Sequence, residues 1–150
     1  MYAISNSLAK AKLNQPNNLI EVTFKGYAIP QIYQETLDII QEIGLSNELN
    51  NWVFNKENFS GILASDLLNY IVDWAKKGHQ RFEKQKVDEV CKVLIVAHSP
   101  LLEQLNCELS TGNYRYPNII ISVNSSQLNV NKFFKPKTLT QKVLQRVKII

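Results

Sequence analysis

The sequence feature that most constrains the fold is an uninterrupted apolar run, Val93–Ala97. Three of its five residues are β-branched, and no polar residue alternates with them. Such a run predicts a central strand covered on both faces, as in parallel sheets. A second β-branched run, Ile119–Val123, predicts another strand. Since the longest apolar run has five residues, we expect no membrane span, which requires about 20.

The first 28 residues have the alternating pattern of a β-hairpin. Apolar residues alternate with lysines in Ala9–Leu13, and Asn14–Asn18 supplies turn-forming residues. Ile20–Phe24 then alternates apolar with polar side chains, as expected for a strand with one buried face. We expect Gly26 to end this second strand.

The middle of the chain alternates between predicted helices and strands. Pro30 fits the first turn of an amphipathic helix over residues 30–43, which Gly44 is expected to end. The short aromatic run Trp52–Phe54 predicts a buried strand. Residues 55–61 are expected to form a loop.

Three further helices are predicted from capping residues and periodicity. Ser65 is expected to cap the helix that follows the loop. Ser99 is expected to cap the next helix, with Pro100 as its first residue. Apolar residues that recur at helical spacing between Leu139 and Val147 predict a final amphipathic helix.

The predicted order of elements is β-β-α-β-α-β-α-β-α. Strands that alternate with helices indicate an α/β layered domain whose later strands are largely parallel. The chain has 150 residues and neither an internal repeat nor a long linker. We therefore expect one domain over residues 1–150.

Charge is distributed unevenly along the chain. The net charge is +4, yet residues 109–150 contain seven Lys and Arg residues and no acidic residue. The basic end from Lys132 to Lys148 can attract an anionic partner, although basic residues spaced this loosely usually form a solvated face. Only Phe133 and Phe134 are interleaved with these charges, so binding of nucleic acid through base stacking is disfavoured.

Cysteine usage and the first residues predict a cytoplasmic location. Cys91 and Cys107 are far apart in sequence and fit a reduced protein better than a disulfide framework. The N-terminus has no basic segment followed by an apolar stretch, so we expect no secretory signal.

The best-placed polar residues for a site are His98 and Ser99, directly after the central strand. Crevices form beyond the carboxyl ends of parallel strands, so both residues are candidates for the edge of a pocket. An adjacent His and Ser do not by themselves make a catalytic pair. Neither a phosphate-binding glycine motif nor metal-ligand spacing is present. We therefore expect no catalytic residue, no cofactor, no metal and no enzyme activity.

Aromatic residues in the first half of the chain allow two interpretations. Trp52, Phe54, Phe59 and Trp74 could line a ligand cage, but each lies on a predicted apolar face. Core packing is the favoured interpretation.

A second aromatic group precedes the last predicted strand. Tyr114, Arg115 and Tyr116 form a candidate partner surface, since these residue types are frequent at interface hot spots. An ordinary loop at a strand edge is the simpler interpretation.

Short motifs spread over residues 17–123 share the pattern of one known family. They are Phe24-Lys25-Gly26-Tyr27, Thr36-Leu37-Asp38-Ile39-Ile40, Trp52-Val53-Phe54-Asn55 and Asn58-Phe59-Ser60-Gly61-Ile62, with Asp66 and Trp74 on the next helix. In these motifs the chain resembles the small STAS/SEC14-like (SpoIIAA-like) proteins of Bacteroidetes and related bacteria. The resemblance implies a single mixed sheet of four to five strands with helices packed mainly on one face, and no established enzyme activity.

The resemblance also implies a protein-interaction module in bacterial signalling. Better understood STAS relatives are antagonists of anti-sigma factors, in which phosphorylation of a serine near the second helix blocks binding. Ser60 or Ser65 is the candidate by position, and the expected contact surface runs from Asn55 to Asp66. The chain lacks the Asp-Ser-Ser/Thr-Gly signature of the antagonists.

Two alternative functions stay open. The SEC14 side of the resemblance implies a domain that binds a small molecule or lipid in an apolar cavity between the second helix and the sheet. The basic C-terminal helix would instead bind an anionic partner. The expected partner is an unidentified protein, and a homodimer is left open.

Overall fold

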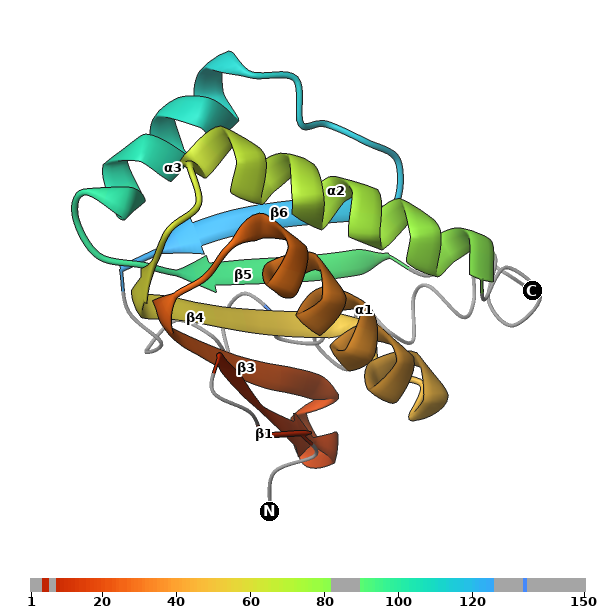
Figure 1. Ribbon diagram of the computed structural model, residues 1–150. Coiled ribbons are helices and arrows are strands. Elements are labelled where there is room, and N and C mark those ends of the chain that lie inside the picture. Colours follow the sequence, from red (N-terminus) through yellow and green to blue (C-terminus); the bar gives the residue numbers. More distant parts are fainter. Residues whose placement is uncertain (1–3, 6–7, 82–89, 126–133, 135–150) are drawn as a thin grey trace.

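The computed structural model describes residues 4–5, 8–81, 90–125 and 134, and these form one mixed sheet and three α-helices (Figure 1). The strands are β1 (Ile4–Ser5), β2 (Ala9–Asn14), β3 (Leu19–Tyr27), β4 (Asn51–Ser60), β5 (Cys91–Val96) and β6 (Ile119–Asn124). The helices are α1 (Pro30–Ser46), α2 (Ala64–Arg81) and α3 (Leu101–Thr111), with a 3₁₀ turn, Gln15–Asn17, inside the hairpin. The predicted α/β class is therefore confirmed.

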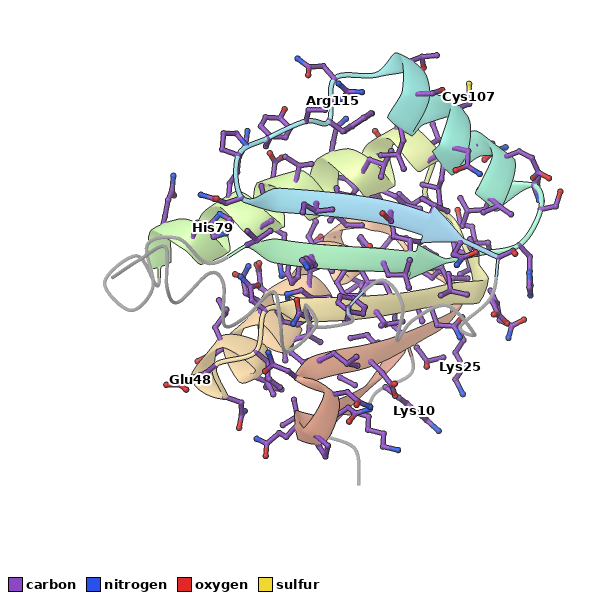
Figure 2. The ribbon with its side chains drawn as sticks, turned by 180° about the vertical axis from the view of Figure 1, so that it is seen from behind. Lys10, Lys25, Glu48, His79, Cys107 and Arg115 are labelled. Carbon is purple, nitrogen blue, oxygen red and sulfur yellow. The ribbon has the colours of Figure 1, made fainter. Side chains whose placement is uncertain are left out.

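The strands lie in the sheet in the same order as in the sequence. β1, β2 and β3 are antiparallel, whereas β3, β4, β5 and β6 are parallel. Each parallel strand is added on the same side of the one before it. Because crossovers between parallel strands are right-handed, α1, α2 and α3 then all lie on one face of the sheet. Figure 1 shows these helices in front of the sheet, and the view from behind in Figure 2 shows the strands in front of them.

Five strands have six residues or more, and the two-residue β1 adds a short sixth strand that no sequence pattern indicated. The predicted helix between Leu139 and Val147 lies outside the described residues, as does most of the basic end. None of the described helices is both long enough and apolar enough to cross a membrane.

The core between sheet and helices is mainly aromatic. The rings of Trp52 and Trp74 lie 4.8 Å apart between centroids, and Phe54 is 5.5 Å from Trp74. The Trp74 indole N–H donates to the Leu37 carbonyl at 2.6 Å, and the Trp52 indole N–H donates to Asn50 Oδ1 at 2.9 Å. These side chains are packed and hydrogen-bonded inside the core, so the core interpretation holds and the ligand-cage interpretation is wrong.

The opposite face of the sheet carries a second, smaller apolar cluster. Leu19, Val53, Leu94 and Val96 are each at most 2% exposed, and Phe134 packs against them. On the helix side Val93 and Ile95 belong to the main core. β5 is therefore buried on both faces, as its unbroken apolar sequence predicts.

The predicted loop over residues 55–61 is wrong, because β4 continues to Ser60. Thr23 pairs with Asn55 but Lys25 pairs with Asn58, so β4 contains one more residue than β3 in this interval. This β-bulge changes which face the following side chains point to. The polar sequence of this segment hid the strand, since alternation is lost at the bulge.

Three predicted helix ends are also corrected. α1 continues through Gly44 to Ser46. α2 begins at Ala64, and the Leu67 N–H donates to the Leu63 carbonyl, so Ser65 lies in the first turn and not before it. α3 begins at Leu101 with Pro100 at the cap position and no side-chain cap, so Ser99 is not the N-cap. The Ser99–Pro100 peptide bond is cis.

Gly44 lies inside α1 because the helix approaches the sheet there without room for a side chain. A Cβ at this position would collide with Ile20 Cδ1 and Trp52 Cη2. Both of these atoms belong to fully buried side chains. The glycine thus serves close packing and not helix termination.

We expect Gly44→Ala to destabilise the fold by about 1–3 kcal/mol, the usual cost of an overpacked core. Urea unfolding of the variant measures this loss. Ser46→Ala, at an exposed position of the same helix, is the control and should leave the unfolding free energy nearly unchanged. Equal stability of Gly44→Ala and wild type would contradict the close packing described.

Candidate functional site

The carboxyl ends of the four parallel strands meet at one edge of the sheet, on the left in Figure 1. Tyr27 ends β3, Ser60 ends β4, and His98 follows β5 closely. In sheets of this kind, the connections that leave the carboxyl edge form the usual binding region. We therefore built the candidate site from this edge.

Four of the six exposed large apolar side chains in the described part of the chain lie at this edge. Tyr27 is 77% exposed, Leu63 71%, Ile29 53% and Ile32 44%. We call these four residues the carboxyl-edge patch. Single exposed apolar residues are ordinary on protein surfaces, but a group of them rimmed by polar residues marks an interaction site.

The backbone holds the two halves of the carboxyl-edge patch together. Tyr27 pairs with Ser60 in the sheet, and the Ala28 N–H donates to the Ser60 carbonyl at 3.1 Å. Gly61 follows with φ of +109°, and a Cβ there would collide with the backbone of Ala28. Only glycine fits this close turn without strain. Leu63 is thereby placed beside the β3–α1 connection.

The side chains of Glu57 and His98 contact each other at the same edge. His98 Nε2 lies 3.3 Å from Glu57 Oε2, with side chains 58% and 29% exposed. An exposed pair of this kind contributes at most about 1 kcal/mol to stability. The structure thus places His98 at the predicted carboxyl edge and adds Glu57, which sequence reasoning missed.

Ser99 is exposed and follows His98 directly. Among the described residues, no hydrogen bond joins its hydroxyl to the Glu57–His98 pair, so the three residues do not form a charge-relay arrangement. The same part of the chain contains no group of three His, Cys, Asp or Glu residues able to hold a metal ion.

Beneath the carboxyl-edge patch lies a fully buried lysine, Lys56, which is 1% exposed. Its Nζ donates to the Tyr33 hydroxyl at 2.6 Å. The same nitrogen is 3.9 Å from the ring centroid of Phe24, 4.1 Å from that of Tyr33 and 4.5 Å from that of Phe59. Phe54 closes this aromatic cage at 5.7 Å. The cage is filled by the chain's own side chain and is not a ligand site.

Burial controls the protonation of both polar groups in the cage. Loss of water lowers the pKa of Lys56 well below its ordinary value and raises the pKa of Tyr33. The aromatic faces favour an ammonium ion, but desolvation outweighs them. The Tyr33 phenol contacts the Lys56 amine, and its ring lies 6.3 Å from that of Tyr70. No carboxylate in the described part of the chain forms an ion pair with Lys56.

The candidate serine residues lie close to the carboxyl-edge patch. Ser60 is exposed at the end of β4, and Ser65 is partly buried in the first turn of α2. Asp66, in the same turn, is partly buried and lies near enough to Tyr114 to act on its pKa. The structure therefore brings Asp66 and Tyr114 together, although 47 residues separate them in the sequence.

Tyr114 and Tyr116 pack against the helices and are only partly available to a partner. Burial, together with a 3.2 Å hydrogen bond to Glu108 and the charges of Glu108 and Asp66, raises the pKa of Tyr114. The Lys76 ammonium lies 3.9 Å above the ring of Tyr116. Arg115 is exposed and points away from the molecule in Figure 2.

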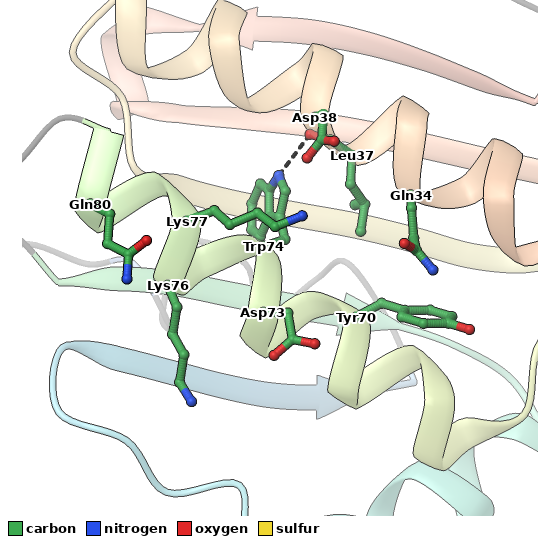
Figure 3. Close-up of a pocket in the computed structure, with 9 residues that line it drawn as sticks. All are labelled: Gln34, Leu37, Asp38, Tyr70, Asp73, Trp74, Lys76, Lys77 and Gln80. Carbon is green, nitrogen blue, oxygen red and sulfur yellow. Dashed lines mark hydrogen bonds between the residues drawn. The ribbon is translucent and has the colours of Figure 1, made fainter.

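The structure also contains a groove between α1 and α2, shown in Figure 3. Its volume is about 250 Å³. It is lined by charged and amide side chains, among them Asp38, Asp73 and Lys77, and by the apolar Leu37 and Trp74. This groove differs from the apolar cavity expected between the second helix and the sheet. Packed aromatic side chains occupy that space.

Comparison with known proteins adds no assignment. The chain matches no protein-family model, and no curated protein matches it significantly.

The sequence offered little sign of the residues that make this edge distinctive. Lys56 continues the alternation of Trp52 and Phe54 by two residues, which is the one signal that predicts an inward side chain. Tyr27 and Leu63 lie just outside the predicted elements, where apolar residues carry no periodic signal.

We expect the unfolding free energy to rise with pH as the pH approaches the ordinary lysine pKa of about 10.4 from below, by up to about 1.4 kcal/mol per pH unit. The folded chain binds the Lys56 proton less tightly than the unfolded chain does, so stability is gained between the lowered folded-state pKa and the ordinary lysine pKa. Tyr33 acts only above about pH 10, where its raised folded-state pKa makes stability fall as the pH rises further.

Urea unfolding at several pH values checks this expectation. Lys56→Met combined with Tyr33→Phe removes both buried polar groups and should lose this part of the pH dependence without lowering stability at pH 7. Lys77→Met, at an exposed position, should keep it. An unchanged pH dependence in the double variant would show that Lys56 remains charged in the folded protein.

Proposed function

We propose that this protein is a non-enzymatic interaction module of the STAS/SpoIIAA-like type, which binds a protein partner through the carboxyl-edge patch in bacterial signalling. The observation that carries the proposal is that four exposed apolar residues, Tyr27, Ile29, Ile32 and Leu63, lie at one edge of the sheet. This edge includes the surface from Asn55 to Asp66 that the family resemblance indicates.

The chemistry of the edge fits a protein partner. Apolar anchors at the centre of an interface supply most of its binding energy when a partner covers them, and a polar rim adds specificity. Here Asn58 and Ser60 are exposed, and the Glu57–His98 pair lies on the same edge. The partner is expected to present an apolar surface with hydrogen-bonding groups at its margin.

Rigid support under the patch also favours this function. The Lys56 cage and the Gly61 turn fix the backbone from which Tyr27 and Leu63 project. A preorganised surface loses less conformational entropy on binding than a mobile loop does.

Capture from a lysate of the source organism tests the proposal. We expect Tyr27→Asp combined with Leu63→Asp to reduce recovery of the partner at least tenfold, because a buried charge would oppose the apolar contact. Ile39→Asp replaces a 45% exposed isoleucine on α1, outside the patch, and should leave recovery unchanged. Equal recovery of the partner by wild type, the Tyr27/Leu63 double variant and Ile39→Asp would contradict the proposed surface.

The same proposal includes regulation: phosphorylation of Ser60 would block binding of the partner. A phosphate carries about −1.5 to −2 charges at neutral pH and would lie directly beside Tyr27, its strand partner. Ser65 is less accessible because it is partly buried in the helix. Ser60 is therefore the favoured position.

We expect Ser60→Asp to weaken partner capture. We also expect the intact mass of wild-type protein isolated from its own host to include one phosphate, and that of Ser60→Ala to lack it. Ser65→Ala serves as the matched control and should retain the added mass. A phosphate that persists in Ser60→Ala and disappears in Ser65→Ala would assign the modification to Ser65 and contradict this choice.

A further inference from the structure

The groove between α1 and α2 is lined by charges of both signs (Figure 3). Asp38 comes from α1, whereas Asp73 and Lys77 come from α2. The Lys77 side chain extends into the groove in Figure 3. Lys76 instead points away from α1, and its ammonium lies 3.9 Å above the ring of Tyr116. Two carboxylates and one ammonium therefore face the same hollow.

These three charged groups have no partner of opposite charge within the protein. In the part of the chain that the structure describes, no ion pair or hydrogen bond joins the side chain of Asp38, Asp73 or Lys77 to another residue. Asp73 and Lys77 are four residues apart on α2, the spacing at which opposite charges commonly pair along a helix. Because the two remain apart, a ligand that carries both signs can pair with each of them.

The size and polarity of the groove restrict the ligand further. Its volume of about 250 Å³ is below the roughly 300–1,000 Å³ of sites for drug-sized molecules. Leu37 and Trp74 are at most 3% exposed and offer little surface to a lipid or another apolar ligand. The amides of Gln34 and Gln80 also line the groove, and an amide both donates and accepts hydrogen bonds. A small polar molecule is therefore the favoured ligand.

We propose that this groove binds a small molecule with two cationic groups and one carboxylate, the chemical class of the basic amino acids. Asp38 and Asp73 would each pair with one cationic group, and Lys77 would pair with the carboxylate of the ligand. Charge-assisted hydrogen bonds of this kind are among the strongest in proteins. The proposal goes beyond the proposed function, because none of the four residues of the carboxyl-edge patch lines the groove.

Titration with L-lysine, followed by heteronuclear NMR, tests the proposal. Trp74 lines the groove and its indole N–H donates to the Leu37 carbonyl, so the indole resonance reports binding. We expect this resonance to shift in a saturable manner. L-norleucine lacks the side-chain amine of L-lysine, and cadaverine lacks its carboxylate. Each of these two probes should bind about fivefold more weakly than L-lysine, because one charged contact is lost.

Two double variants test the carboxylates. Asp38→Asn combined with Asp73→Asn should weaken binding of L-lysine at least tenfold, because both cationic groups lose their charged partners. Glu35→Gln combined with Glu42→Gln is the matched control. It removes the same charge from exposed positions of α1 that do not line the groove, and should leave the affinity nearly unchanged. Circular dichroism confirms that both double variants are folded.

Lys77→Met tests where the carboxylate of the ligand lies. This variant should bind L-lysine about fivefold more weakly than wild type does. Its affinity for cadaverine should be unchanged or higher, since cadaverine has no carboxylate to pair with Lys77. Equal weakening of both ligands would overturn the proposed arrangement.

Absence of saturable binding of L-lysine, or equal weakening by the two double variants, would overturn the proposal. Binding of L-norleucine or cadaverine as tightly as L-lysine would likewise overturn it. Tyr27→Asp combined with Leu63→Asp should bind L-lysine as wild type does. Failure of this ligand site and failure of the proposed function are therefore distinguishable.

Discussion

The burial of Lys56 is the constraint on which the arrangement of β4 and its surroundings depends. A lysine amine inside a protein core requires a hydrogen-bond partner and close aromatic walls, and here β3, β4 and α1 each supply part of them. A shift of one residue in β4 would turn Glu57 inward and Lys56 outward. The cage therefore fixes strand register as well as side-chain packing.

The bulge in β4 follows from the same constraint. Trp52, Phe54 and Lys56 face the helices at alternate positions, and a regular strand would turn Phe59 to the opposite face. One additional residue between Asn55 and Asn58 brings Phe59 back toward Lys56 and Tyr33. The strand then ends at Ser60, where the Gly61 turn brings Leu63 toward Tyr27. Internal packing thus determines what the carboxyl edge presents to a partner.

Much of the fold could be predicted from local patterns. Val93–Ala97 predicts a strand covered on both faces, because no polar residue alternates with its apolar residues. Ile119–Val123 predicts a strand because it is rich in β-branched residues. The first hairpin follows from strict alternation. The prediction fails where tertiary contacts override local preference. Gly44 has the sequence position of a helix end but is required by the approach of Trp52. Residues 55–61 have the polar composition of a loop because one of the two buried residues among them, Lys56, is a lysine.

The candidate site was predictable only in part, for a related reason. His98 lies where the strand order predicts, but its partner Glu57 comes from a segment whose register the sequence does not reveal. Ser60 was identified by its position in the sequence. That Tyr27 and Leu63 lie at the same edge is evident only once the pairing of β3 and β4 is known. Exposed apolar residues outside helices and strands follow no periodic pattern, so the sequence does not predict a surface of this kind and the three-dimensional structure is needed to identify it.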